Sequence, residues 1–211
     1  MDIISKYYNI KKNILILNKI VNLVVVTKSQ SLDHIKKLIN LGHLHFGENK
    51  VQDAKQKWLE YKKVNNEVKL HMIGGIQSNK VKDIVKIFDY VHSIDSQKIV
   101  EIFKREEVKQ NKNLYYFIQV NLANEEQKSG VNINKLDSLV NFCKELKLNL
   151  IGLMCIPPVN QDPVKYFIDL KKISLKYNLH DLSMGMSSDY ISAIKCGSTF
   201  IRVGSAIFSE N

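Results

Sequence analysis

Residues 21–42 have the sequence VNLVVVTKSQSLDHIKKLINLG, in which one hydrophobic pattern gives way to another. The first seven residues are almost uniformly apolar, which is typical of a strand buried on both faces in a parallel sheet. The segment after them places four apolar residues on one helical face, Leu32, Ile35, Leu38 and Ile39. Gly42 then supplies an end to that helix. The stretch therefore predicts a β-strand followed by an amphipathic α-helix.

The same order of strand and helix recurs along the rest of the chain. Further strands are predicted over residues 43–47, 69–74, 90–94, 114–122, 149–156, 182–187 and 200–208. Eight strands with helical crossovers predict an α/β fold, a (β/α)8 TIM barrel, rather than an open doubly wound sheet. No GxGxxG motif follows any of these strands, which argues against a dinucleotide-binding fold.

The segment before the first strand is expected to cover the outside of the barrel. A closed barrel needs a cover over its eighth strand, and only three residues follow the predicted strand 200–208. Residues 3–18 are amphipathic and otherwise unassigned, so we expect an N-terminal helix that packs outside the barrel near its first and last strands. No linker rich in Pro, Gly or Ser divides the chain, so a single domain over residues 1–211 is expected.

The composition excludes several classes of protein. With 45% hydrophobic and 25% charged residues, the chain is neither disordered nor fibrous. No stretch reaches the roughly 18 apolar residues of a membrane span, and lysines interrupt the first twenty residues, unlike a signal peptide. Three cysteines without a CxxC pair predict neither a disulfide framework nor a metal site. A cytoplasmic setting is therefore expected.

The net charge of +10 raises the question of a nucleic-acid partner. Only two of the 31 basic residues, Arg105 and Arg202, are arginines, and the lysines are spread evenly along the chain. Phosphate-binding surfaces tend to cluster basic residues and to use arginine forks. An even excess of Lys, Asn and Ile is instead typical of a genome poor in G and C. We expect no nucleic-acid partner, and a basic nucleic-acid-binding protein is kept as an alternative.

The functional groups of a (β/α)8 barrel lie at the carboxyl ends of its strands, where Thr27 and Lys28 end the first strand. A lysine at the mouth of an apolar strand is expected to be desolvated, which lowers the pKa of its amine and favours Schiff-base chemistry. The alternative is that one of many lysines lies at a strand end by chance. The third strand leads into residues 74–80, GGIQSNK, which predict either an anion site or only a tight turn.

The last two predicted strands carry serine, glycine and arginine together. Ser187 follows the seventh strand, and Arg202, Gly204 and Ser205 lie on or after the eighth. Loops after strands seven and eight commonly hold a phosphate in barrels of this kind. The first strand adjoins the eighth in a closed barrel, so Lys28 is expected to face the same mouth. An amine, a fixed cation and a phosphate cradle together fit pyridoxal 5′-phosphate (PLP).

Eight segments resemble, in order and spacing, the pyridoxal phosphate homeostasis protein family of the YggS/PROSC type. They are VVVTK, HFGEN, HMIGGIQSNK, SIDS, VNLANEEQKSG, GLMCIPP, LSMGMSSD and GSTFIRVGSAIF. The chain departs from the usual pattern at Thr27, Cys155, Ser205 and Ser209 and lacks a proline soon after Lys28. The resemblance implies a barrel like the N-terminal domain of alanine racemase. It further implies PLP held as an internal aldimine on Lys28, with Asn49 near the ring, Arg202 beside the pyridine nitrogen, and Ser187, Gly204 and Ser205 at the phosphate.

Arg202 bears most on the expected activity. A guanidinium beside the pyridine nitrogen keeps that nitrogen unprotonated, which weakens the ring as an electron sink and disfavours transamination and decarboxylation. Racemisation needs a second base, which alanine racemase takes from another domain and a partner subunit. We therefore expect a monomeric PLP carrier without robust turnover, with no catalytic residue, that takes part in PLP homeostasis and supplies PLP-dependent apoenzymes. The main alternative is an amino-acid racemase whose base is His45, His71 or a tyrosine.

Overall fold

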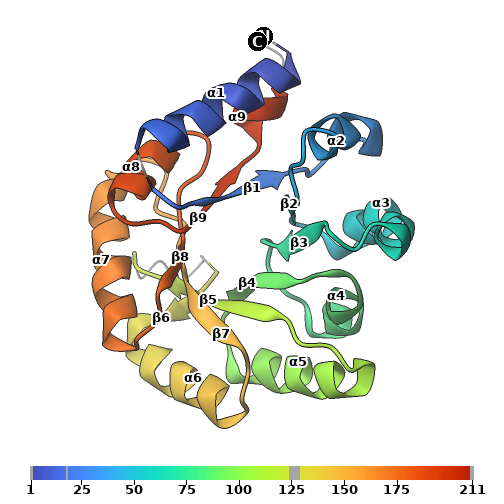
Figure 1. Ribbon diagram of the computed structural model, residues 1–211. Helices are drawn as coiled ribbons and strands as arrows, with labels where there is room; N and C mark the ends of the chain where they lie inside the picture. The colour runs from blue at the N-terminus through green and yellow to red at the C-terminus, as the bar shows by residue number, and fades with distance from the viewer. Residues whose placement is uncertain (1, 18, 124–128, 210–211) are drawn as a thin grey trace.

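The computed structural model in Figure 1 describes residues 2–17, 19–123 and 129–209 of the chain. Part of the segment VNLANEEQKSG, residues 124–128, and the last two residues lie outside this range. The barrel strands of the described part are β1 (Asn22–Val26), β2 (His45–Glu48), β3 (Lys69–Met72), β4 (Tyr90–Ile94), β5 (Tyr115–Asn121), β7 (Leu150–Met154), β8 (Asp181–Ser183) and β9 (Phe200–Val203). Each pairs in parallel with the next in this order, and β9 returns to β1. The predicted eight-stranded (β/α)8 barrel is confirmed.

Helices surround the barrel on its outside (Figure 1). They are α1 (Ile3–Ile16), α2 (Leu32–Ile39), α3 (Val51–Val64), α4 (Val81–Ile87), α5 (Gln97–Gln110), α6 (Ile133–Glu145), α7 (Pro163–Lys176), α8 (Tyr190–Lys195) and α9 (Ser205–Phe208). A short strand, β6 (Val131–Asn132), pairs only with the end of β5. The apolar stripe predicted for residues 32–39 is present in α2, whose Ile35 and Leu38 are fully buried.

The prediction of one long strand over residues 200–208 is wrong in its second half. β9 ends at Val203, and Ser205–Phe208 form the short helix α9. Ile207 is fully buried from this helix. A short apolar run is equally compatible with a buried strand and a buried helical turn, so hydrophobicity alone could not separate the two. The seventh predicted strand, 182–187, is also too long, because β8 ends at Ser183 and the backbone turns at Gly185, whose φ is +93°.

Helix α1 packs on α8 and α9, the helices that flank β9 in the sequence. Its start is capped by Asp2, whose side chain accepts a hydrogen bond from the backbone N–H of Ser5 at 2.8 Å. Tyr7, Ile10 and Ile14 form its buried face. Figure 1 shows α1 lying alongside α9 on the outside of the barrel.

His43 joins α1 to the start of β2. Its Nε2–H donates to the carbonyl of His45 at 2.8 Å, and its Nδ1 accepts from the hydroxyl of Tyr7 at 3.3 Å. The residue is only 6% exposed. The pKa of His43 is lowered to about 4, mainly by burial; the hydrogen bond to the carbonyl of His45 opposes this shift, and the charges of His45 and Lys11 add to it. His43 is therefore neutral in the folded protein at pH values where a free histidine is charged.

Acid should destabilise the fold through His43. In the unfolded chain His43 becomes protonated near its ordinary pKa, whereas in the folded chain it becomes protonated only near pH 4. This contribution to the free energy of unfolding is complete above about pH 6.5 and falls by about 2 kcal/mol by pH 4.5. Urea unfolding at pH 7 and pH 4.5 should show a smaller loss for His43→Gln than for the wild type. The exposed His34 gives a control, and equal losses in all three proteins would contradict the assignment.

Candidate functional site

Lys28 lies in the turn that follows β1, at the carboxyl end of the barrel. Val24 of the same strand points into the barrel interior, where it packs with Phe117, Met154 and Phe200. Side chains alternate along a strand, so Val26 also faces inward, and Lys28 follows two residues later, beyond the end of the strand. The side chain of Lys28 is nevertheless exposed, and the expected desolvation of its amine is wrong. The burial ends at Thr27, because Lys28 belongs to the turn and no longer to the strand.

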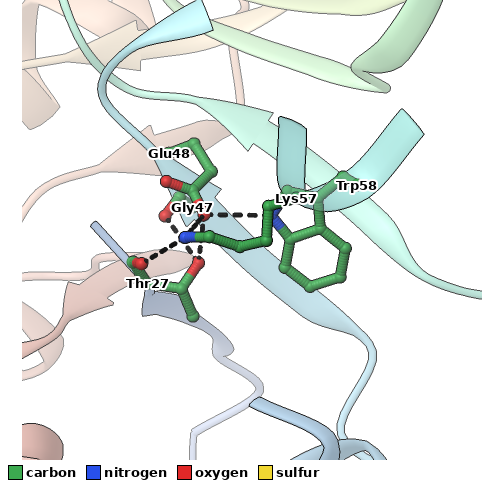
Figure 2. A network of polar contacts seen from close by, with 5 residues as sticks. All are labelled: Thr27, Gly47, Glu48, Lys57 and Trp58. Atoms are coloured by element: carbon green, nitrogen blue, oxygen red, sulfur yellow. Dashed lines mark hydrogen bonds and ion pairs between the residues drawn. The ribbon is translucent and has the colours of Figure 1, made fainter. Parts of the chain in front are cut away.

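Thr27, the residue before Lys28, belongs to a cluster of four hydrogen-bonded side chains (Figure 2). This Glu48 cluster consists of Thr27, Glu48, Lys57 and Trp58. Glu48 Oε1 accepts hydrogen bonds from Thr27 Oγ1 at 2.7 Å, Lys57 Nζ at 2.7 Å and Trp58 Nε1 at 2.9 Å. Lys57 Nζ also donates to the backbone carbonyl of Thr27 at 2.8 Å. Helix α3 and strand β2 thereby fix the backbone from which Lys28 projects.

The sequence did not identify the Glu48 cluster. Glu48 was recognisable only as part of the HFGEN segment, and Lys57 and Trp58 only as parts of a polar helix. One usable signal was present: Glu48 is a carboxylate that directly ends a buried strand, and Glu is almost never fully buried unless it is paired. Such a residue predicts a buried partner, although it does not say which one.

Arg202 projects into the barrel from β9 and is only 4% exposed. Its Nη1–H donates to Ser183 Oγ at 2.6 Å and its Nη2–H to the carbonyl of Cys155 at 3.1 Å. Both acceptors are uncharged. A guanidinium has five N–H donors and keeps its proton, so further donors remain for an acceptor bound nearby. Neither Ser183 nor the Cys155 carbonyl was predicted as a partner.

Ser187, Gly204 and Ser205 lie close together at the start of α9. Ser187 Oγ accepts hydrogen bonds from the backbone N–H groups of Gly204 at 3.4 Å and Ala206 at 3.1 Å. Ser205 is the exposed first residue of the helix. A side chain at position 204 would place its Cβ 3.0 Å from the carbonyl oxygen of Val26, so the backbone approaches β1 closely here. Two N–H groups thus converge on one oxygen beside β1.

Asn49 is half-buried after β2 and packs against the next strand's loop through Gly74. A Cβ built on Gly74 would lie 2.1 Å from the carbonyl oxygen of Asn49. The carbonyl of Gly74 in turn accepts a hydrogen bond from Ser93 Oγ at 2.5 Å. The following residues, Ser78–Lys80, form a single 3-10 turn without a side-chain cap. Of the two interpretations offered for this loop, the geometry favours the tight turn.

The predicted site residues lie on four consecutive strands of the barrel. Asn49 follows β2, Lys28 follows β1, Arg202 and Gly204 belong to β9 and its end, and Ser187 follows β8. The register pairs Val24 of β1 with Arg202 of β9. Because the carboxyl ends of parallel strands meet at one end of a barrel, these groups share one sector of its mouth.

The sequence matches the family "Alanine racemase, N-terminal domain" over residues 6–211. It is 34% identical over 199 residues to the pyridoxal phosphate homeostasis protein of Pasteurella multocida, covering 89% of this chain and 85% of the relative. It is 40% identical over 202 residues to the protein of that name from Helicobacter pylori, covering 90% and 88% of the two chains. The chain belongs to the pyridoxal phosphate homeostasis protein family. The resemblance seen in its eight sequence segments is thereby confirmed.

Solved structures agree with this membership of the pyridoxal phosphate homeostasis protein family. PipY of Synechococcus elongatus, solved without PLP, superposes with a TM-score of 0.91 at 28% identity, over 99% of this chain and all of PipY. The structure of PipY with PLP bound gives a TM-score of 0.86 over the same shares of both chains. An alanine racemase of Clostridium difficile, at 10% identity and a TM-score of 0.71, shares the fold.

The described residues, 2–17, 19–123 and 129–209, contain neither a metal-binding cluster nor a membrane-spanning helix. No group of three or more His, Cys, Asp or Glu side chains in that part of the chain is arranged to hold a metal ion. No helix there is long and apolar enough to cross a bilayer. The three barrel histidines, His45, His71 and His92, instead hydrogen-bond to one another.

Proposed function

We propose that this chain binds PLP reversibly through Lys28 and takes part in PLP homeostasis, with residues 1–211 acting as one domain. The relatives' name and the PLP-bound PipY structure support this proposal. The observation that carries it is Arg202, a buried cation next to the lysine-bearing strand whose two hydrogen-bond acceptors are both uncharged. When bound, PLP supplies an aldehyde that condenses with a primary amine, losing water as C=O becomes C=N.

Lys28 is the proposed amine because it follows the carboxyl end of β1, which pairs with the strand of Arg202. The Glu48 cluster also anchors the backbone of the preceding residue, Thr27. The exposure of Lys28 leaves its amine accessible to an incoming aldehyde. Reversible binding requires such access for water as well, because water must return to release the aldehyde. An exposed amine on a fixed backbone therefore suits a carrier.

Arg202 is proposed to donate to the pyridine nitrogen. Two of its five N–H donors are taken by Ser183 and Cys155, and a ring nitrogen is an acceptor that a remaining donor can use. Since the guanidinium does not release its proton, this nitrogen stays unprotonated. The arrangement disfavours chemistry at the α-carbon of an amino acid.

The start of α9 is proposed to bind the phosphate. The N–H groups of Gly204 and Ala206 already point at one oxygen, that of Ser187, and a phosphate oxygen accepts the same kind of hydrogen bond. The absence of a side chain at Gly204 lets the backbone lie against Val26. Ser205 adds a hydroxyl at the same place, and Asn49 lies two strands away, where the ring is proposed to sit.

The racemase alternative loses two of its candidate bases in this geometry. His71 uses both ring nitrogens, one with His45 and one with His92, and burial lowers its pKa well below the ordinary value. His45 uses Nδ1 for His71 and lies at the amino end of β2, opposite the mouth. We therefore propose a carrier without robust turnover. We further propose that it acts as a cytoplasmic monomer that supplies PLP to apoenzymes, in keeping with three free cysteines.

Borohydride reduction of the PLP-loaded protein should fix a pyridoxyl group on Lys28. The reagent converts the C=N bond into a stable amine, so peptide mapping identifies the labelled residue. Lys28→Ala should abolish the visible imine band, because no other lysine of the described residues lies within two residues of the carboxyl end of a strand that pairs with β9. Lys80→Ala, on the third βα loop, is the matched control and should keep the band. A label on Lys80 would overturn the proposal.

A further inference from the structure

A continuous chain of hydrogen bonds crosses the interior of the barrel. His45 Nδ1 and His71 Nε2 lie 2.9 Å apart, and His71 Nδ1 and His92 Nε2 also lie 2.9 Å apart. His92 Nδ1 lies 2.7 Å from Ser183 Oγ, the same oxygen that accepts from Arg202. This series of hydrogen bonds therefore runs from β2 through β3, β4 and β8 to the guanidinium of Arg202 on β9.

Aromatic side chains enclose this chain of hydrogen bonds. The ring of His71 stacks on Tyr90 with centroids 4.2 Å apart, and the ring of His92 stacks on Phe117 at 4.4 Å. Phe200 lies 6.0 Å from both histidine rings. His71, His92 and Ser183 are completely buried. In such surroundings each link needs one donor and one acceptor, since an unpaired polar group costs more here than at the surface.

The number of available protons fixes which group donates and which accepts in each of these hydrogen bonds. Arg202 can only donate, so Ser183 Oγ accepts from it, and among the described residues the one other partner of this completely buried hydroxyl is His92 Nδ1. The hydroxyl proton of Ser183 is therefore satisfied only when it is donated to His92 Nδ1, because an unpaired buried donor is costly. A neutral imidazole that accepts at Nδ1 donates from Nε2. His92 therefore donates to His71, and His71 donates to His45. A positively charged ring at His71 or His92 would bring two donors together in one link or leave the hydroxyl proton of Ser183 without an acceptor.

We propose that His92 and His71 are positioning residues for Arg202. They act by drawing the hydroxyl proton of Ser183 away from the guanidinium, so that Ser183 Oγ presents only lone pairs to Arg202. All three histidines then share one neutral tautomer, with the proton on Nε2. Burial lowers the pKa values of His71 and His92 well below the ordinary value, which agrees with neutral rings.

The composition of the barrel interior supports a positioning role over simple packing. Branched apolar residues normally fill the interior of such barrels. Here the inward positions of β3, β4 and β8 carry His71, His92 and Ser183, each at the cost of desolvation. A lone serine could accept from Arg202, but its own proton would have no fixed acceptor. His92 supplies that acceptor.

The tautomers can be tested on the protein without PLP. Nitrogen-15 NMR of the histidine rings should show Nε2–H and an unprotonated Nδ1 for His45, His71 and His92 at pH 7. The exposed His34 serves as the internal reference for a solvated ring. A proton on Nδ1 of His92, or a charged ring at His71 or His92, would overturn the proposal. This measurement needs neither PLP binding nor a variant that folds.

The effect on the cofactor rests on the proposed function and is tested by a pair of variants. His92→Leu removes the acceptor for Ser183, whereas His92→Asn keeps an oxygen acceptor near the position of Nδ1. His92→Leu should weaken PLP binding about tenfold and shift the visible imine band, because a hydrogen bond to a charged group is loosened. His92→Asn should lie closer to the wild type. A folded His92→Leu protein with the affinity and spectrum of the wild type would contradict the positioning role. Failure of the wild type to bind PLP would instead contradict the proposed function.

Discussion

Replacing Glu48 with alanine should lower the free energy of unfolding by about 3–5 kcal/mol. The carboxylate is completely buried and accepts three hydrogen bonds through one oxygen, from Thr27, Lys57 and Trp58. The side chain of Lys57 is only 12% exposed, so the substitution leaves a buried ammonium without its counter-charge. The loss of a buried partner is costly because the remaining charge is neither paired nor hydrated.

Glu60 provides a matched control for Glu48. The Glu60–Lys63 pair has the same 2.7 Å separation as the Glu48–Lys57 pair, but its side chains are 77% and 61% exposed. Exposed pairs contribute about 1 kcal/mol or less, so Glu60→Ala should be nearly neutral. Urea unfolding followed by circular dichroism measures both variants. Similar losses for the two would contradict the role assigned to burial.

The architecture could be predicted because burial leaves a direct trace in the sequence. The run over residues 21–27 is almost uniformly apolar because helices cover β1 outside and the barrel core covers it inside, as Val24 and Val25 show. Helix α2 shows the other trace, with Ile35 and Leu38 on its buried face. Strand order in a closed barrel then predicts that the first strand adjoins the last, and the observed pairing of Val24 of β1 with Arg202 of β9 agrees.

The ends of elements were harder to predict, because local hydrophobicity does not report backbone conformation. Ile207 is apolar in a helix for the same reason that Val203 is apolar in a strand: both are fully buried. Lys28 shows the converse problem. An apolar strand before a lysine suggests burial, but a turn of one or two residues is enough to expose the side chain.

The partners of the site residues could not be predicted because they depend on register between distant strands. His92 and Ser183 are 91 positions apart in the sequence and meet only because both face inward at the same level. Glu48 and Lys57 meet because α3 folds back over β2. Hydrophobic patterns set which face is buried, but they do not say which polar residues oppose one another across a barrel. The supporting groups of the site are therefore a product of the tertiary structure.

Gly74→Ala should be the second severe substitution, with a cost of about 3 kcal/mol, at the upper end for overpacking. The new Cβ would lie 2.1 Å from the carbonyl oxygen of Asn49, 2.8 Å from its carbonyl carbon and 2.9 Å from its Cα. All three are backbone atoms, so no side chain can rotate away. The conflict can be relieved only by moving the loop after β2, which carries Asn49, or the loop after β3.

The neighbouring glycine makes this prediction specific. A Cβ on Gly75 would meet nothing within 4 Å, so Gly75→Ala should be neutral or stabilising by up to about 1 kcal/mol through the unfolded chain. Urea unfolding of the two variants compares one added methyl group at adjacent positions. If Asn49 contributes to the proposed PLP site, Gly74→Ala should also weaken PLP binding where it remains folded, while Gly75→Ala should bind as the wild type does. Equal stability of the two variants would show that the loops after β2 and β3 can separate freely, because only their close contact distinguishes Gly74 from Gly75.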